Sequence, residues 1–272
     1  MRFLPATTWG LTTTAILLVS ASCTRSQPAQ REVTQAKAAT LAMATPPEQA
    51  EAPPAACPGG MVLVEGEYCP DVEQKCIAWM DPPSSRYHHF RCAKYEPSVC
   101  ASKQSVHMRY CIDVTERSEP TEENKPRHFM SWTSSKKLCE SEGGRLCRES
   151  EWQFACEGEE MRPYPYGWER DAEACNVDRK DDIGRPGRLV DHRSAVGSHP
   201  RCASPFGVQD MAGNVEEWVQ ADGHGKMGWK EVLKGSWWIP SRHACRQFQV
   251  GHNDVYHGAE TGTRCCKDAA PP

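Results

Sequence analysis

The sequence has no apolar run long enough to cross a membrane as a helix. Its best candidate, residues 11–19, is short and contains three threonines, whereas a spanning helix needs about 20 predominantly apolar residues. Apolar residues make up only 39% of the chain, which also carries 21 prolines and 20 glycines. This composition predicts a single thin hydrophobic core with many loops, and no membrane-spanning helix.

The chain also lacks a large excess of charge of either sign. The 32 Lys and Arg residues and 36 Asp and Glu residues are interspersed, and the formal net charge is -4. A protein that binds nucleic acid or an anionic membrane face needs a basic patch or stripe, so the sequence argues against both partners. No repeat of fixed period is present.

The first 22 residues have the layout of a secretory signal peptide. Arg2 gives a positive start, residues 11–19 are apolar, and the small residues 20–22 precede Cys23. A cysteine at this place predicts a bacterial lipobox in which Cys23 is lipidated, and ordinary signal cleavage is the alternative. The expected product is an exported, lipid-anchored protein, periplasmic or on the outer-membrane surface, whose membrane contact is the lipid.

The number of cysteines agrees with an exported protein. There are 15 cysteines, and setting Cys23 aside leaves 14, enough for seven disulfides. Odd totals are unusual in secreted chains because one thiol is stranded, and disulfides persist in oxidising compartments. The sequence therefore predicts a domain that is rich in disulfides.

Composition divides the mature chain into two parts. Residues 23–56 are rich in Ala, Gln, Pro, Thr and Glu and contain few large apolar residues, which predicts a disordered linker. Residues 57–268 form the expected domain. Its predicted strands are 60–64 and 110–114, separated by an insert, 69–100, whose four cysteines we expect to pair with one another.

Two helices are expected in the middle of the chain. The first covers 131–142, where Ser131 can cap the N-terminus and a Gly-Gly pair stops the helix. The second covers about 149–156. Farther along, Gly, Pro, Asp and Trp predominate and regular structure thins out, so the predicted fold class is a single irregular α+β domain.

Several segments, taken in order, resemble the formylglycine-generating enzyme (sulfatase-modifying factor) family. The resemblance covers about residues 58–266, and the segments that carry it are 60–66, 110–116, 131–139, 144–152, 164–167, 196–198, 206–218, 232–237 and 262–265. It implies a disulfide-rich α+β fold related to C-type lectins. It also implies the disulfides Cys139–Cys265 and Cys156–Cys245.

The resemblance implies structural calcium as a cofactor. At one site the matching positions are Asp210, Gly213, Val215 and Glu217, and carboxylate and carbonyl oxygens are the ligands that Ca²⁺ prefers. The alternative is a capped turn with solvated acids. The residue before Glu217, usually tryptophan in the family, is glutamate here. A second site maps onto Asn176, the Val177 carbonyl and Asp191.

The copper site of the active enzymes has no counterpart in the sequence. Those enzymes hold copper with two cysteines four residues apart, just after a Gly-Ser-aromatic turn, and soft thiolates suit Cu(I). The turn here is Gly235–Trp237, and the next cysteine, Cys245, matches the family's structural cysteine. No copper is therefore expected. A non-catalytic binding or scaffold module is favoured, and an enzyme on the same scaffold is the alternative.

The ligand of such a module would be a peptide, a protein or a glycan. Trp237 and Trp238 follow the turn and either fill the core or contact that ligand. His252 and His257 lie five residues apart on an expected loop, where solvated or hydrogen-bonded histidines are commoner than metal ligands.

Overall fold

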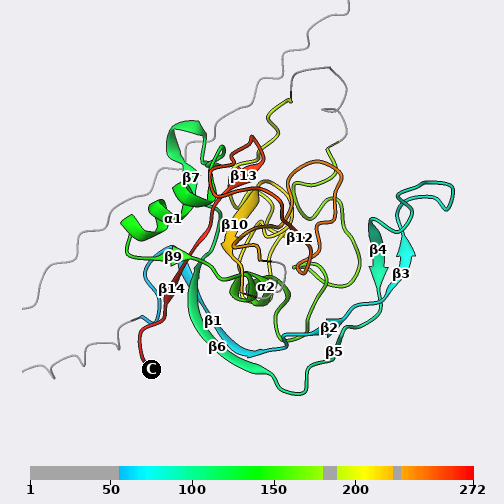
Figure 1. Ribbon diagram of the computed structural model, residues 1–272, viewed down its shortest axis with the longest axis horizontal. Helices are drawn as coiled ribbons and strands as arrows, with labels where there is room; N and C mark the ends of the chain where they lie inside the picture. The colour runs from blue at the N-terminus through cyan, green and yellow to red at the C-terminus, as the bar shows by residue number, and fades with distance from the viewer. Residues whose placement is uncertain (1–54, 180–188, 223–227) are drawn as a thin grey trace, which may run out of the picture. The chain divides into compact units, whose positions relative to one another are not determined.

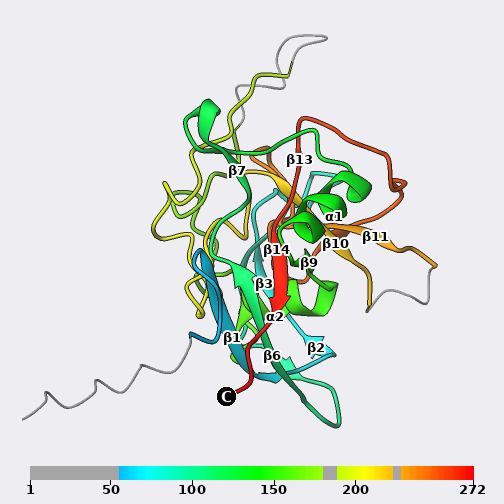
Figure 2. The same cartoon turned by 90° about the vertical axis from the view of Figure 1, so that its left-hand side faces the viewer.

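Two long antiparallel strands form the frame of the first sheet. β1 (Met61–Tyr68) pairs with β6 (Val106–Asp113) along its whole length, from Met61 opposite Asp113 to Tyr68 opposite Val106. The short strand β14 (Cys265–Asp268) lies on the other side of β6, and β9 (Arg145–Leu146) completes the order β1-β6-β14-β9 (Figures 1 and 2). Both strands that the sequence predicts are therefore present.

This computed structural model describes residues 55–179, 189–222 and 228–272. The expected signal peptide, Cys23 and almost all of the expected linker lie outside these residues. The described residues fall within one unit of the chain, and together with its strands and helices this agrees with the predicted α+β class.

The second sheet collects segments from the last quarter of the chain. Its order is β12-β11-β10-β13, and its strands are β10 (Glu216–Gln220), β11 (Glu231–Lys234), β12 (Phe248–Gln249) and β13 (Thr261–Gly262). β10 and β11 are antiparallel, whereas β10 and β13 run parallel. Both edge strands have only two residues, so the sheet offers little free backbone to another chain.

The two helices begin where the sequence predicts. Helix α1 (Trp132–Ser141) is capped by Ser131. The Ser131 hydroxyl accepts a hydrogen bond from the Ser134 backbone N–H, and the Ser134 hydroxyl accepts one from the Ser131 backbone N–H. Such reciprocal bonds satisfy backbone donors that the first helical turn leaves unpaired. Helix α2 (Glu149–Glu157) lies against the second sheet and is almost entirely buried.

The insert between β1 and β6 builds two small sheets of its own. β2 (Val72–Glu73) pairs with β5 (Val99–Cys100), and β3 (Cys76–Trp79) pairs with β4 (Cys92–Tyr95). In Figure 1 the β3–β4 hairpin projects from the rest of the domain. A third pair, β7 (Ser118–Glu119) and β8 (Lys125–Pro126), encloses the 3₁₀ turn η1 (Pro120–Glu122).

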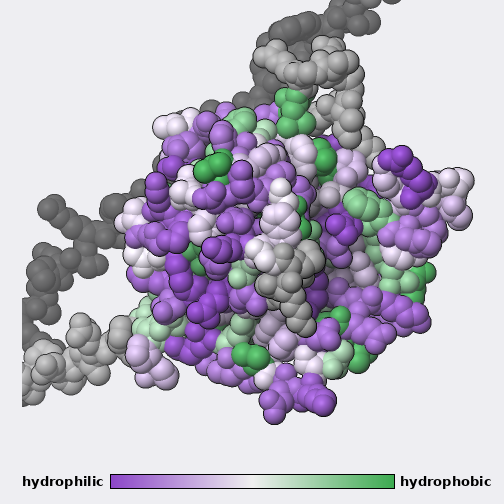
Figure 3. Space-filling view, in the orientation of Figure 1, coloured by the Kyte–Doolittle hydropathy of each residue, from purple (hydrophilic) through white to green (hydrophobic). Residues whose placement is uncertain are grey.

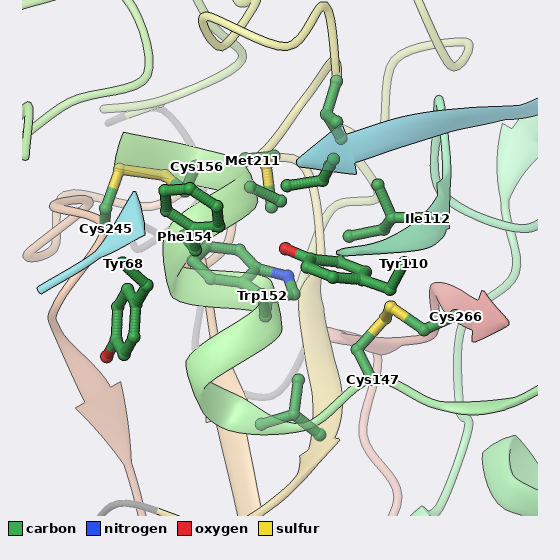
Figure 4. Packing of buried hydrophobic residues seen from close by; sticks show 14 of the residues in the cluster. Tyr68, Tyr110, Ile112, Cys147, Trp152, Phe154, Cys156, Met211, Cys245 and Cys266 are labelled. Atoms are coloured by element: carbon green, nitrogen blue, oxygen red, sulfur yellow. A yellow bond between two sulfur atoms is a disulfide. The ribbon is translucent and has the colours of Figure 1, made fainter. Parts of the chain in front are cut away.

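Helix α2 supplies the centre of the main hydrophobic core. Trp152 and Phe154 are fully buried and pack with Ile112, Met211 and Tyr110 (Figure 4). The Tyr110 hydroxyl donates to the Glu151 carbonyl at 2.5 Å, which satisfies the polar end of a buried ring.

Seven disulfides cross-link the domain. They are Cys57–Cys111, Cys69–Cys100, Cys76–Cys92, Cys139–Cys265, Cys147–Cys266, Cys156–Cys245 and Cys175–Cys202. The two pairs that the resemblance implies are among them, and the four cysteines of the insert pair with one another. So many disulfides are typical of an exported protein.

The described residues include no helix that is both long enough and apolar enough to span a membrane. The face of the molecule shown in Figure 3 is mainly hydrophilic, with hydrophobic residues in small separate patches.

Candidate functional site

A tight turn at Gly235 and Ser236 ends β11 and opens the candidate site. Both residues have left-handed backbones, with φ of 84° and 58°. A side chain at Gly235 would meet the Met211 carbonyl and the Trp152 ring at 3.3 Å, so glycine suits this position. The Ser236 side chain is held in place, because the residue is only 8% exposed.

A small cavity of about 80 Å³ lies beside this turn, and we call it the Ser236 pocket. Its lining comes from the β3–β4 loop, β10, β11 and the turn after it, β12, and the chain on either side of Cys245. The residues are Phe90, Glu216, Leu233, Gly235, Ser236, Ser241, Arg242, Gln247, Phe248 and Gln249. The Ser236 hydroxyl has no hydrogen-bond partner among the described residues. The pocket therefore contains a polar group that a ligand could satisfy.

The cationic and aromatic side chains of the pocket belong to different parts of the chain. The Arg242 guanidinium lies 5.1 Å from the centre of the Phe90 ring, a separation that favours cation–π attraction. Phe90 comes from the loop that joins β3 to β4, so the insert contributes directly to this pocket.

Glu216 brings a buried carboxyl group to the Ser236 pocket. The residue is 4% exposed, and burial, reinforced by the charge of Glu260, raises the pKa of Glu216 to about 8. At neutral pH this carboxyl group is mainly protonated and can both donate and accept hydrogen bonds. Glu260 is itself bonded by the Tyr256 hydroxyl at 2.5 Å.

The two tryptophans after the turn have different surroundings. Trp238 is fully buried, so it fills the core, whereas Trp237 is only partly buried. The Trp237 carbonyl is 2.8 Å from Nε2 of the buried His243. Burial, with the nearby charge of Arg170, lowers the pKa of His243 to about 4. This histidine is therefore neutral, and its hydrogen bond stabilises the loop that contains Trp237.

The predicted calcium loop precedes β10. Asp210 and Gly213 have positive φ, and one oxygen of the buried Asp210 accepts from the Gly197 backbone N–H at 2.6 Å. A side chain at Gly213 would lie 2.2 Å from the Asn176 carbonyl, so only glycine fits. The turn thus places Asp210 and the Val215 backbone in one buried segment.

The fourth predicted calcium ligand has other partners. Both carboxylate oxygens of Glu217 accept from Arg264, and one also accepts from the Trp152 indole N–H at 2.6 Å. Glu217 therefore has its charge balanced inside the core.

A buried acid that the sequence did not single out lies beside this loop. Glu116 is 2% exposed, and neither of its carboxyl oxygens has a hydrogen-bond partner among the described residues. Burial and the charges of Asp210 and Glu217 raise the pKa of Glu116 well above its usual value. A buried carboxyl group of this kind is one that a bound cation would compensate, so Glu116 joins Asp210 among the residues that could hold an ion at this loop.

A larger groove, of about 400 Å³, lies between residues 58–61 and the end of α1. Arg117 crosses it and pairs with Asp113 at 2.7 Å and with Glu142 at 2.6 Å. Arg117, Asp113 and Glu142 thus pair with one another, and Glu116 of the predicted calcium site also lines this groove. We take the Ser236 pocket as the candidate ligand site because it follows the Gly235–Ser236 turn and contains an unpaired hydroxyl.

Comparison with known proteins identifies the family of the chain. The sequence pattern of the sulfatase-modifying factor enzyme 1-like domain matches residues 57–269. The chain belongs to this family. Its match to the sulfatase-modifying factor domain extends from the first disulfide-bonded cysteine to the end of β14.

The curated relatives are longer than the part of them that matches. "Inactive C-alpha-formylglycine-generating enzyme 2" of Bos taurus is 27% identical over 158 residues, which are 54% of this chain and 52% of that protein. "Serine/threonine-protein kinase pkn1" of Chlamydia caviae is 33% identical over 103 residues, 38% of this chain and 15% of the kinase. The chain thus spans about half, or less, of the relatives it matches.

Among solved structures, PvdO from Pseudomonas aeruginosa is similar with a TM-score of 0.49 and 15% identity. The match covers 76% of this chain and 94% of PvdO.

The donor set for copper that the sulfatase-modifying factor family implies does not fit here. Cys245, the cysteine that follows the Gly235–Ser236 turn, is bonded to Cys156 with an S–S distance of 2.01 Å. Every cysteine of the described residues is in a disulfide, so they offer no pair of thiolates to Cu(I).

The second calcium site implied by the family does not fit either. The Asn176 side-chain oxygen accepts from Arg179 at 2.9 Å. Both carboxylate oxygens of Asp191 accept from Arg193, at 3.0 and 2.9 Å. Guanidinium groups thus use the side-chain oxygens that calcium would need.

Proposed function

We propose that this protein is a non-catalytic member of its family that binds a ligand at the Ser236 pocket. The observation that supports the proposal is the Cys156–Cys245 disulfide, because it removes Cys245, the cysteine that follows the Gly-Ser turn in the sequence, from metal chemistry. The relative named as an inactive formylglycine-generating enzyme supports the same conclusion.

The pocket retains the features of a binding site. It has a partner-free hydroxyl, a neutral carboxyl and an aromatic–arginine pair in one concave place. Ligand sites typically combine an apolar wall with a few convergent polar groups.

We also propose that lipid on Cys23 holds the protein in the cell envelope. Residues 1–22 followed by Cys23 support this proposal, and the linker at 23–56 would separate the domain from the membrane. Metabolic labelling with an alkyne fatty acid should mark the full chain and should not mark Cys23→Ala. An unlabelled wild-type chain would contradict lipid anchoring.

Calcium at the Asp210 loop is part of the proposal as a structural ion. Asp210 and Glu116 would supply carboxylate oxygens, and Gly213 and Val215 would supply backbone carbonyls. Adding a calcium chelator should lower the melting temperature of the wild-type protein. The variant Asp210→Asn, which tolerates the positive φ, should melt lower and lose its response to chelator.

The decisive experiment measures Cu(I) binding and cysteine oxidation by the mature protein. We expect no stoichiometric tight Cu(I), no turnover of a cysteine-containing peptide, and seven disulfides by mass spectrometry. Stoichiometric Cu(I) together with peptide turnover would overturn the proposal and favour a formylglycine-type oxidase.

A further inference from the structure

The polar groups of the Ser236 pocket are suited to a neutral ligand that both donates and accepts hydrogen bonds. The Ser236 hydroxyl has no hydrogen-bond partner among the described residues, and the buried Glu216 belongs to the same lining. Gln247 contributes an amide to the same lining. Hydroxyl, carboxyl and amide groups each offer a donor and an acceptor, so a ligand with one carbonyl and one N–H would satisfy several of them together.

The size of the pocket restricts what can enter. Its volume of about 80 Å³ is about half that of an engineered core cavity, about 150 Å³, that admits benzene. A whole sugar ring or a large side chain does not fit, whereas an acetamido group, with four heavy atoms, does. Its methyl group would meet the partly exposed Phe248 of the lining.

The mouth of the pocket can support a larger flat group. Phe90 is 41% exposed, and the Arg242 guanidinium lies over its ring. Aromatic rings present an apolar face against which the C–H groups of a pyranose ring can pack. Arg242 supplies N–H donors for hydroxyl groups at the same place.

This part of the fold is less suited to binding an extended peptide. Recognition by strand addition requires an unpaired strand edge. The edges of the adjacent sheet are β12 and β13, and each has only two residues. A sugar needs no strand edge, so the geometry favours a glycan over a peptide.

We propose that the Ser236 pocket binds the acetamido group of an N-acetylated amino sugar, with the pyranose ring against Phe90 and Arg242. This inference rests on the proposed binding function and names its ligand class.

Calorimetric titration of the mature protein with three trisaccharides tests the proposal. The probes are N,N′,N″-triacetylchitotriose, its deacetylated counterpart chitotriose, and cellotriose, which carries hydroxyls instead. We expect the acetylated sugar to bind at least about tenfold more tightly than the other two. Equal affinity for all three, or no binding of the acetylated sugar, would overturn the inference.

Variants locate the binding within the pocket. Ser236→Gly removes the hydroxyl and tolerates the positive φ, and Phe90→Ala removes the aromatic wall. Both should weaken binding of the acetylated sugar at least about tenfold while the melting curve is preserved. Val99→Ala, at an exposed position of the same insert, should bind normally. Unchanged affinity in both pocket variants would refute the assignment.

A separate outcome distinguishes this inference from the proposed function. Binding of peptides at the pocket, abolished by Phe90→Ala and without any sugar binding, would overturn the glycan assignment and leave a non-catalytic binding module in place. Copper-dependent peptide oxidation would overturn the proposed function instead.

Discussion

Arg264 and Glu217 form an ion pair inside the core, with Nη2 of Arg264 2.8 Å from Oε1 of Glu217 and side chains only 0% and 1% exposed. The Arg264 guanidinium also donates to the Asp113 and Gln209 carbonyls. One buried cation thus joins β6, the segment that leads into Asp210, β10 and the chain that enters β14.

Removing this cation should be costly. Arg264→Met leaves Glu217 buried without its counter-charge, and breaking a buried pair in this way typically costs about 3–5 kcal/mol. We expect that loss in the free energy of unfolding measured with guanidinium chloride. The control is Lys75→Met, which breaks a pair whose side chains are 66% and 45% exposed and should cost at most about 1 kcal/mol. Similar losses in the two variants would contradict this account.

The Cys156–Cys245 disulfide should contribute more to stability than the shortest cross-link of the insert. Its loop has a sequence separation of 89, against 16 for Cys76–Cys92. Chain entropy predicts about 4–5 kcal/mol for the longer loop and about 3 kcal/mol for the shorter. Thermal unfolding of two variants, each with both cysteines of one disulfide changed to serine, tests which disulfide stabilises the protein more. A larger loss of stability on removing Cys76–Cys92 would contradict this prediction.

Stability should fall as the pH rises through the range in which Glu216 ionises. Burial raises the pKa of Glu216 to about 8 from the model-compound value of 4.5, so between these values the folded state binds more protons than the unfolded state. Glu216 therefore favours folding below about pH 4.5, and this advantage is lost as the pH approaches 8. Glu260 and Tyr256 interact electrostatically with Glu216, and Arg242 belongs to the same pocket lining.

The variant Glu216→Gln isolates this contribution, since Gln keeps the shape and does not ionise. The decline in melting temperature between pH 5 and pH 8 should be smaller in Glu216→Gln than in the wild type. If the melting temperatures of the two proteins fall in parallel between pH 5 and pH 8, Glu216 does not titrate in this range.

Calcium titration should find one site per chain and not two. At the second family position the oxygens of Asp191 are bonded by Arg193, which also donates to the Pro126 carbonyl at 2.5 Å and to Glu122 at 2.9 Å. Arg193→Met should lower the melting temperature because it releases these contacts. Equilibrium dialysis measures the number of bound ions. Two calcium ions bound to the wild type would contradict the conclusion that the Arg193 guanidinium takes the place of calcium beside Asp191.

The sequence predicted those features that depend on short stretches of chain. Ser131 and the Gly143–Gly144 stop define α1 locally, and the opening strand and the cysteine-rich insert also have local signals. The two-residue strands had no such signal, because pairing with distant segments creates them.

The site was less predictable for the same reason. Glu116 matters because the loop that contains Asp210, almost a hundred residues later in the sequence, folds against it. Arg179 and Arg193 could not be matched to Asn176 and Asp191 from spacing alone. The sequence could not decide whether Trp238 fills the core or contacts a ligand. Its complete burial shows that it fills the core.

The adjacent cysteines of β14 have a consequence for biosynthesis. Cys265 and Cys266 bond to Cys139 and Cys147, at sequence separations of 126 and 119. Other cysteines lie much closer to Cys139 and Cys147 along the chain, Cys156 among them, and short loops close at a lower entropy cost than long ones. Incorrect local disulfides are therefore favoured early in oxidation, so efficient production of this protein should depend on a thiol-disulfide isomerase where the chain is oxidised.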